Sequence, residues 1–221
     1  GAHCPSNAPV KKYDVHAINV EITLNQWGDY YPGYTYALKE DIERIRAEEE
    51  KNAKARESDI DPGAVSNGLQ GDAIQPLVIR ANQGDCVRIH FSNDLEDEDA
   101  GFQVNGSAMI ISSSGMPASA ASPGGITTSG ESQDFEWMIP IDEQEGGHQI
   151  QSHAGRDPSS LGLTGTFVVE PLGSRYLDPW DAKPVKSGWE AMIVNEDEKD
   201  FREFVIVYHE VGDESFRPLN R

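Results

Sequence analysis

The chain has 221 residues, of which 37% are hydrophobic and 25% are charged, as in an ordinary globular protein. No stretch approaches the roughly 18 consecutive apolar residues of a membrane-spanning helix, so we expect no membrane span. The formal net charge of −20 repels phosphate backbones and argues against nucleic-acid binding. The same acidity suits a soluble protein, a saline habitat or a cationic partner.

The first quarter of the chain predicts an arm, a strand and a loop. Residues 1–12 contain Pro5 and Pro9 and show little periodicity, which predicts an irregular N-terminal arm. Alternating side chains from Tyr13 to Leu24 predict a strand. Residues 25–36 are rich in Tyr, Gly and Pro and therefore predict a loop.

Residues 38–57 predict the single convincing helix of the chain. They are dense in Glu, Lys, Arg and Ala, which are good helix formers. Glu40–Arg44 and Glu50–Lys54 have the spacing of stabilising ion pairs on a helix surface. The apolar stripe is thin, so we expect an exposed helix inserted into a β domain, followed by a polar loop over residues 58–75.

Short strands separated by Gly, Ser and Pro clusters dominate the remaining sequence. The clearest strand starts at Cys86, with Val87, Ile89 and Phe91 on one face and Cys86, Arg88 and His90 on the other. The other expected strands are 77–79, 102–104, 108–112, 135–139, 148–152, 163–170, 191–194 and 201–211. Residues 171–188 predict a linker. This pattern indicates an antiparallel sandwich or barrel.

Several segments carry a resemblance to one family. Residues 145–153 read EGGHQIQSH and residues 162–171 read GLTGTFVVEP. Residues 84–89 read GDCVRI, and residues 68–76 read GLQGDAIQP after the helical insertion. Together these stretches resemble the N-terminal cupredoxin domain of the multicopper oxidases, in particular the large bacterial type related to manganese oxidases.

The resemblance implies a cupredoxin-like Greek-key β-sandwich with one inserted surface helix. It divides the chain into an arm (1–12), a cupredoxin-like domain (13–171, with the helical insertion at about 38–57) and a third segment (172–221). The third segment corresponds to a linker and the opening strands of a second, incomplete cupredoxin-like domain. The family also implies an extracytoplasmic location, either periplasmic or secreted.

The residues at the family's copper-ligand positions do not match the family. Two His-x-His pairs there supply half of a trinuclear copper site, because side chains two apart on a strand share a face. In this chain the first pair falls on Gln103 and Asn105, and the second on Gln151 and His153. An amide is a weak, neutral oxygen donor that does not replace imidazole at copper. We therefore expect no copper or other cofactor, no catalytic residue and, at most, metal binding by His153.

The remaining metal candidates are weaker. His148 lies five residues before His153, an odd offset that places the two on opposite faces of a strand. A type 1 copper site needs a Cys with two His and usually a Met, and no such pattern follows Cys86. From the residues alone, Cys4 and Cys86 are either a disulfide or two free thiols, and the resemblance to an exported family favours the disulfide.

Three hypotheses for function remain. The first is a degenerate module that has lost its trinuclear copper site and serves assembly as a non-catalytic subunit, binding a protein partner, further cupredoxin domains or a second copy. The second is the N-terminal fragment of an active multicopper oxidase, whose copper lies in other domains. The third is a mononuclear metal or cation module that uses His153, His148 or the acidic run 94–99. For this chain alone, the residues predict no enzyme, although the family consists of enzymes.

Overall fold

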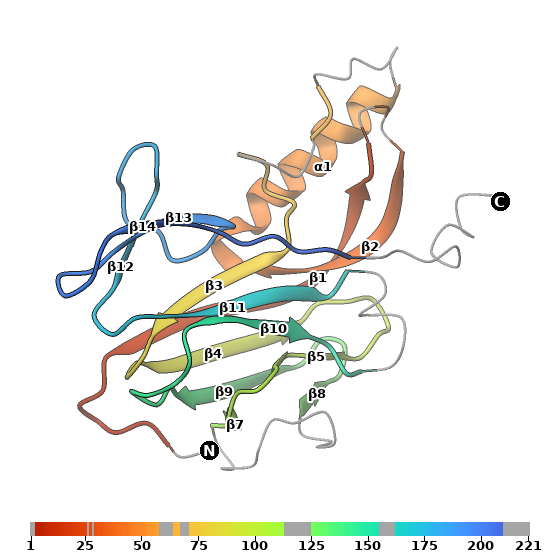
Figure 1. Cartoon of the computed structure of the whole chain (residues 1–221). Coiled ribbons are helices and arrows are strands. Elements are labelled where there is room, and N and C mark those ends of the chain that lie inside the picture. The colour runs from red at the N-terminus through yellow and green to blue at the C-terminus, as the bar shows by residue number, and fades with distance from the viewer. Residues whose placement is uncertain are drawn as a thin grey trace.

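The computed structural model describes residues 3–25, 27, 29–57, 64–66, 71–112, 125–154 and 162–209. Within these residues the chain forms two sheets packed face to face, a small third sheet and one α-helix (Figure 1). The predicted all-β sandwich with one inserted surface helix is confirmed. The predicted polar loop at 58–75 lies mostly outside the described residues. The Gly-, Ser- and Pro-rich stretch expected to separate strands over residues 112–130 lies partly outside them, and its described part contains the short strand β8 (Ile126–Thr127).

The two main sheets contain most of the strands. The first sheet consists, in spatial order, of β2 (Tyr30–Leu38), β1 (Val10–Thr23), β4 (Cys86–Asn93), β9 (Ser132–Met138) and β7 (Ile110–Ile111). The second consists of β3 (Leu77–Asn82), β11 (Thr164–Glu170), β10 (Gly146–Gln151) and β6 (Gln103–Val104). A separate pair joins β5 (Ala100–Gly101) to β8 (Ile126–Thr127). The pairs β1–β4 and β3–β11 are parallel, which requires crossovers between the sheets.

Aromatic side chains fill the space between the two main sheets. The fully buried rings come from both sheets and from the loop before β6, and they are Phe91, Phe102, Phe135, Trp137 and Phe167. Burying one such side chain contributes about 1.5–3 kcal/mol. The Tyr36 hydroxyl donates a 2.6 Å hydrogen bond to the Gly101 carbonyl, so the one polar group of that buried ring is satisfied.

Strand β1 buries different faces in its two halves. Its first half pairs with β4 and turns Val15 and Ala17 into the sandwich core. Its second half continues beside β2 and turns Ile18 and Val20 the other way, against Ile45 of the helix. This explains why neither face of the segment is clearly polar in the sequence. The β1–β2 hairpin and the helix therefore project together from the sandwich (Figure 1).

The expectation of a loop over residues 25–36 is wrong, because β2 occupies Tyr30–Leu38. Pro32 and Gly33 suggested a turn. However, β2 is the edge strand of its sheet, where a missing backbone N–H is tolerated. Likewise, β1 begins at Val10, inside the expected arm, because the arm is held to β4 by the 2.7 Å bond from the Cys86 N–H to the Pro9 carbonyl.

The helix lies where the sequence predicts it, as a 3₁₀ turn η1 (Lys39–Asp41) followed by α1 (Ile42–Glu57). The predicted pair of Lys54 with Glu50 is present at 2.6 Å. The predicted pair of Glu40 with Arg44 is not: Glu40 pairs with Lys186 at 2.6 Å and Arg44 with Asp41 at 3.2 Å. Glu40 lies in η1, outside the regular α-helical spacing that the pair requires.

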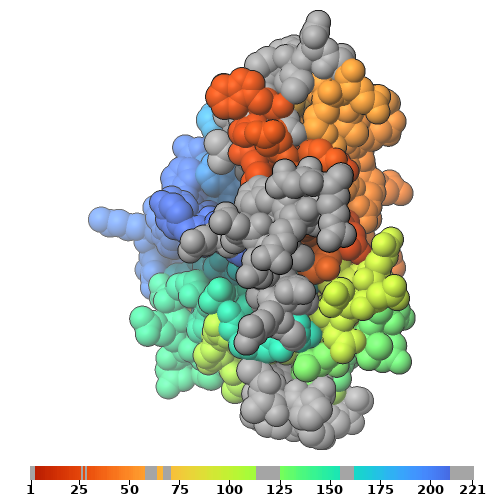
Figure 2. Space-filling view, turned by 90° about the vertical axis from the view of Figure 1, so that its right-hand side faces the viewer, coloured from red at the N-terminus to blue at the C-terminus, as the bar shows by residue number. Residues whose placement is uncertain are grey.

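The last described strands form a third sheet beside the sandwich. It consists of β12 (Arg175–Leu177), β13 (Glu190–Val194) and β14 (Phe201–Phe204), so the expected linker 171–188 contains a strand. This sheet contacts the edge strand β3, where the Gly188 N–H donates to the Val78 carbonyl at 3.0 Å. In Figure 2 the third sheet and α1 lie on opposite sides of the projecting hairpin tip.

A buried arginine joins the third sheet to the sandwich. Arg80 of β3 is fully buried, and its guanidinium lies 3.3 Å from the Glu170 carboxylate and 3.0 Å from that of Glu203 on β14. It also donates to the Gly188 carbonyl at 2.6 Å. Burial, followed by the negative charge of Glu203, raises the pKa of Glu170 to about 7. The contact between the third sheet and the sandwich therefore includes a buried charged group, Arg80, with two carboxylates.

Candidate functional site

The four positions that the family resemblance assigns to copper ligands come together in the structure. Gln103 lies on β6, and Asn105 follows that strand. Gln151 is the last residue of β10, directly opposite Gln103, and His153 follows two residues later. We call these four side chains the amide cluster.

Hydrogen bonds within the amide cluster connect its members to one another. Gln151 Nε2 lies 2.8 Å from His153 Nε2 and donates to Asn105 Oδ1 at 3.2 Å. Gln103 Oε1 accepts from the His153 backbone N–H at 3.2 Å, and Gln103 Nε2 donates to the Gly125 carbonyl at 2.7 Å. Each side chain of the cluster thus has a neighbour that uses its donor or acceptor.

Gln103 is the anchor of the amide cluster, because its side chain is buried whereas Asn105 is exposed and Gln151 and His153 are half-buried. Gly101 makes room for it, since a Cβ there would lie 2.6 Å from Gln103 Oε1. A larger residue at position 101 would therefore displace the Gln103 amide from its present position. A buried amide with both ends bonded stabilises the local backbone and is not free to bind a ligand.

The donor set of the amide cluster does not fit the copper centre of the family. It offers one imidazole, and the nitrogen of that imidazole already faces the Gln151 amide. The other three donors are neutral amides, which bind copper weakly. In the described residues no further histidine joins the cluster from the same face.

His148 lies on the other face of β10, as its odd offset from His153 predicts. Its ring packs edge-on against Trp137 with centroids 5.6 Å apart. Its Nδ1 lies 2.9 Å from the Asn105 carbonyl oxygen. His148 therefore supports the loop that carries Asn105 and adds no donor to the amide cluster.

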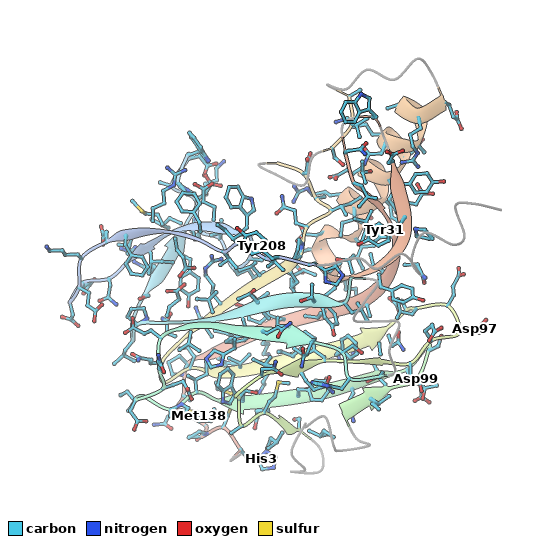
Figure 3. The ribbon with its side chains drawn as sticks, turned by 45° about the vertical axis from the view of Figure 1, so that its right-hand side comes forward. His3, Tyr31, Asp97, Asp99, Met138 and Tyr208 are labelled. Carbon is cyan, nitrogen blue, oxygen red and sulfur yellow. A yellow bond between two sulfur atoms is a disulfide. The ribbon has the colours of Figure 1, made fainter. Side chains whose placement is uncertain are left out.

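Cys4 and Cys86 form a disulfide, with their Cα atoms 5.7 Å apart, that attaches the N-terminal arm to the start of β4. Glu136 of β9 accepts from the Cys4 N–H at 2.9 Å and from Arg88 Nε at 2.9 Å, and His3 Nδ1 lies 3.2 Å from it. Burial alone would raise the pKa of Glu136, but these hydrogen bonds lower it below its usual value. Both sulfurs are used in the disulfide, so Cys4, Cys86 and Glu136 together attach the N-terminal arm to the first sheet. Figure 3 labels His3 on the arm and Met138 at the end of β9, near which the arm passes.

Two other histidines, His16 and His90, lie on the adjacent strands β1 and β4. Each has a carboxylate at hydrogen-bond distance: Asp94 for His16 at 2.5 Å and Asp134 for His90 at 2.7 Å. In the sequence, the alternation of His16 and His90 with apolar residues indicates only that they face away from the core. Which side chains lie beside them becomes clear only from the pairing of β1 with β4.

The acidic run 94–99 forms the loop between β4 and β5. Figure 3 labels Asp97 and Asp99 at the end of the sandwich where β4 finishes. Asp97 has a positive φ of 56°, as aspartate tolerates in turns. In the part of the chain that the structure describes, no three ligand atoms of this run come close enough to hold a metal ion.

Comparisons with known proteins add similarities of fold. No protein-family model and no curated protein matches the sequence. A solved multicopper oxidase is 21% identical with a TM-score of 0.47, over 81% of this chain and 48% of that one. A multicopper oxidase from Campylobacter jejuni, described as a metallo-oxidase, is 17% identical with a TM-score of 0.46, over 79% of this chain and 28% of that one.

A laccase from Pediococcus acidilactici is 14% identical with a TM-score of 0.47, over 78% of this chain and 31% of that one. The chain thus spans less than half the length of each of these structures. Within the described residues, no helix combines the length and the apolar character needed to cross a membrane.

Proposed function

We propose that this chain is a cupredoxin-like module without a trinuclear copper site, which acts in assembly or as a non-catalytic subunit. One observation carries the proposal: the four former ligand positions gather in space, yet three of them are amides that bond one another and the single histidine. A site under selection for copper would keep imidazoles there.

The assembly role is supported by exposed groups suited to a protein partner or to further cupredoxin domains. Asn105 and Gln149 present exposed amides, which offer both donors and acceptors. The third sheet and the segment that follows it add apolar surface, since Phe204 of β14 is 51% exposed and Ile206 beyond it is 70% exposed. β14 is also an edge strand of that sheet, where another strand can pair.

The disulfide supports an extracytoplasmic location, because such bonds persist in oxidising compartments. We propose the periplasm or the cell exterior.

The alternative is that the chain is the N-terminal part of an active multicopper oxidase whose copper lies in other domains. The exposed apolar residues of β14 could be covered either by a further domain of the same chain or by a separate partner, so they support both alternatives equally. The intact mass of the gene product in its native source separates the two. A mass near 24.3 kDa supports the separate subunit, and a much larger mass supports the oxidase.

The test of the main proposal is the copper content of the purified protein, measured with EPR on the same sample. We expect no stoichiometric copper at the amide cluster and no change when His153 is replaced by Gln. Copper that is stoichiometric in the wild type and lost in His153→Gln would overturn the proposal. The measurement is repeated in a variant that lacks His16 and His90, because imidazoles elsewhere also bind copper.

A restored ligand set provides the positive control. Gln103→His, Asn105→His and Gln151→His together rebuild two His-x-His pairs on the same backbone. This triple variant should bind copper at least about tenfold more tightly than the wild type, because imidazole nitrogen replaces amide donors. Gln151→His alone, at a half-buried position, is the milder version if the buried Gln103 does not tolerate replacement.

A further inference from the structure

A cleft lies between α1 and the third sheet, with β3 between them (Figure 1). Its volume is about 520 Å³, which falls within the range of roughly 300–1,000 Å³ that is usual for ligand-binding pockets. Buried Leu77 and Val78 of β3 border it from the sandwich. We call it the tryptophan cleft, after Trp180 and Trp189 on its third-sheet side.

The two tryptophans present aromatic surface at the tryptophan cleft. Trp180 lies between β12 and β13 and is 80% exposed, whereas Trp189 directly precedes β13 and is half-buried. The Arg202 guanidinium lies 5.2 Å from the centroid of the Trp180 ring. Because Trp180 stays so exposed, most of its indole remains open to a ligand. Aromatic side chains of this kind are typical of small-molecule sites.

Hydrogen bonds and packing hold both tryptophans in place. Asp178 Oδ1 accepts from the backbone N–H groups of Trp180 at 2.8 Å and of Asp181 at 3.2 Å, which fixes the turn that carries Trp180. The Trp189 ring packs against that of Phe204 with centroids 5.8 Å apart. A wall that is already ordered loses little conformational entropy when a ligand binds.

The basic groups at the tryptophan cleft are paired with carboxylates. Arg44 Nη1 lies 3.2 Å from Asp41 Oδ1, and Lys186 Nζ lies 2.6 Å from Glu40 Oε1. These pairs leave no unpaired positive charge for an anionic ligand. Their remaining N–H groups and carboxylate lone pairs can still bond a neutral polar ligand, because a guanidinium has five donors and a carboxylate about four acceptor sites.

Gln75 contributes a hydrogen-bond donor that the protein does not use. This residue borders the tryptophan cleft, and its Nε2 atom is buried without a hydrogen-bond partner among the residues that the structure describes. A buried donor left unpaired costs about 1–3 kcal/mol. An oxygen atom of a ligand in the cleft would accept from Gln75 Nε2 and remove that cost.

We propose that the tryptophan cleft binds a neutral saccharide. A sugar ring has an apolar C–H face and a rim of hydroxyl groups. The C–H face stacks on Trp180, because the face of an aromatic ring is negative and attracts weakly positive hydrogens. The hydroxyls, each a donor and an acceptor, bond Gln75 and Arg44. This site goes beyond the proposed function and does not depend on it.

The experiment measures saturation-transfer NMR from the full chain to glucose, galactose, mannose, N-acetylglucosamine, maltotriose, cellotriose and chitotriose. We expect transfer to the C–H protons of at least one of these sugars, and its growth with sugar concentration gives the Kd. Trp180→Ala should weaken binding by at least about tenfold, because it removes the stacking surface. Gln75→Leu keeps the volume, removes the donor and should weaken binding by about three- to tenfold.

Trp27→Ala is the matched control, since Trp27 is also an exposed tryptophan, at 62%, but lies between β1 and β2 and does not border the cleft. It should leave the Kd unchanged. Trp180→Phe keeps a smaller aromatic ring and should retain part of the affinity. Because Trp180 is exposed, neither of its variants should lower the melting temperature, which shows that the fold is intact.

Absence of saturation transfer to all seven sugars would overturn the proposal. So would transfer that is as strong in Trp180→Ala as in the wild type. Tetramethylammonium is the competing probe, because tryptophan faces also bind cations. If it binds through Trp180 and the sugars do not, the cleft is a cation site and the saccharide proposal is wrong. None of these readouts involves copper, so their failure leaves the proposed function untouched.

Discussion

The amide cluster of the second sheet and the two histidines on the outer face of the first sheet, His16 and His90, have different polar neighbours. In the amide cluster, Gln151 and Gln103 bond His153 or its backbone, so donors and acceptors satisfy one another. On the outer face, a carboxylate lies at hydrogen-bond distance from Nδ1 of His16 and of His90, and Asp14 Oδ1 also lies 3.1 Å from His16 Nε2. The two groups therefore differ in charge, because neutral amides contact His153 whereas carboxylates contact the other two histidines.

The largest expected effect comes from removing the disulfide, which lies on the sheet that carries His16 and His90 and not on the sheet of the amide cluster. The Cys4–Cys86 disulfide closes a loop with a sequence separation of 82 and lies at the start of β4, the strand that carries His90. Removing it in the Cys4→Ala, Cys86→Ala double variant should lower the free energy of unfolding by about 3–4 kcal/mol, measured by urea denaturation. Reducing the wild type should lower it similarly.

The imidazole NMR signals of the same variant sharpen the comparison. The signals of His16 and His90 should shift, because the arm that leads into β1 is no longer covalently attached to the start of β4. The His153 signal should stay in place, because the amide cluster belongs to the other sheet. A shift of His153 as large as that of His90 would show that the two groups are not independent.

The next effect is the pH dependence of stability, which Glu170 should dominate. The pKa of Glu170 is raised to about 7 in the folded chain, above its usual value of 4.5. The folded state therefore binds a proton more tightly than the unfolded state. Stability should fall as pH rises from about 4.5 to about 7, by about 1–3 kcal/mol, and should level off above that range.

The control for this prediction is Glu170→Gln, which removes the titrating group next to Arg80. The free energy of unfolding, measured by urea denaturation at pH 5 and pH 8, should differ less in this variant than in the wild type. The pH dependence that remains in the variant arises from the net charge of −20, because the repulsion among the acidic side chains also weakens when they are protonated. Equal slopes in both proteins would contradict the role of Glu170.

A smaller effect tests whether the amide cluster is structural. Gln103→Leu keeps the volume but leaves the buried Gly125 carbonyl and the His153 N–H without the partners they have in the wild type. We expect a loss of about 2 kcal/mol in thermal or urea unfolding. Gln151→Leu, at a half-buried position, should cost less than about 1 kcal/mol. Equal costs would mean that Gln103 does not anchor the cluster.

Local patterns predicted most of the fold. Alternation in Val87, Ile89 and Phe91 was sufficient to place β4, because that strand lies inside the sheet with one face in the core. It failed for β2, because an edge strand tolerates Pro32 and so resembles a loop. It also failed for β12, which is three residues long and gains its order from pairing with β13.

The candidate sites show the same limit. Spacing two apart correctly brought Gln151 and His153 to one place, because that relation is local. The relation of Asp14 to His90 depends on the parallel register of strands separated by more than seventy residues, which no local pattern encodes. The spacing of residues along the chain therefore predicted the amide cluster but not the neighbours of His16 and His90.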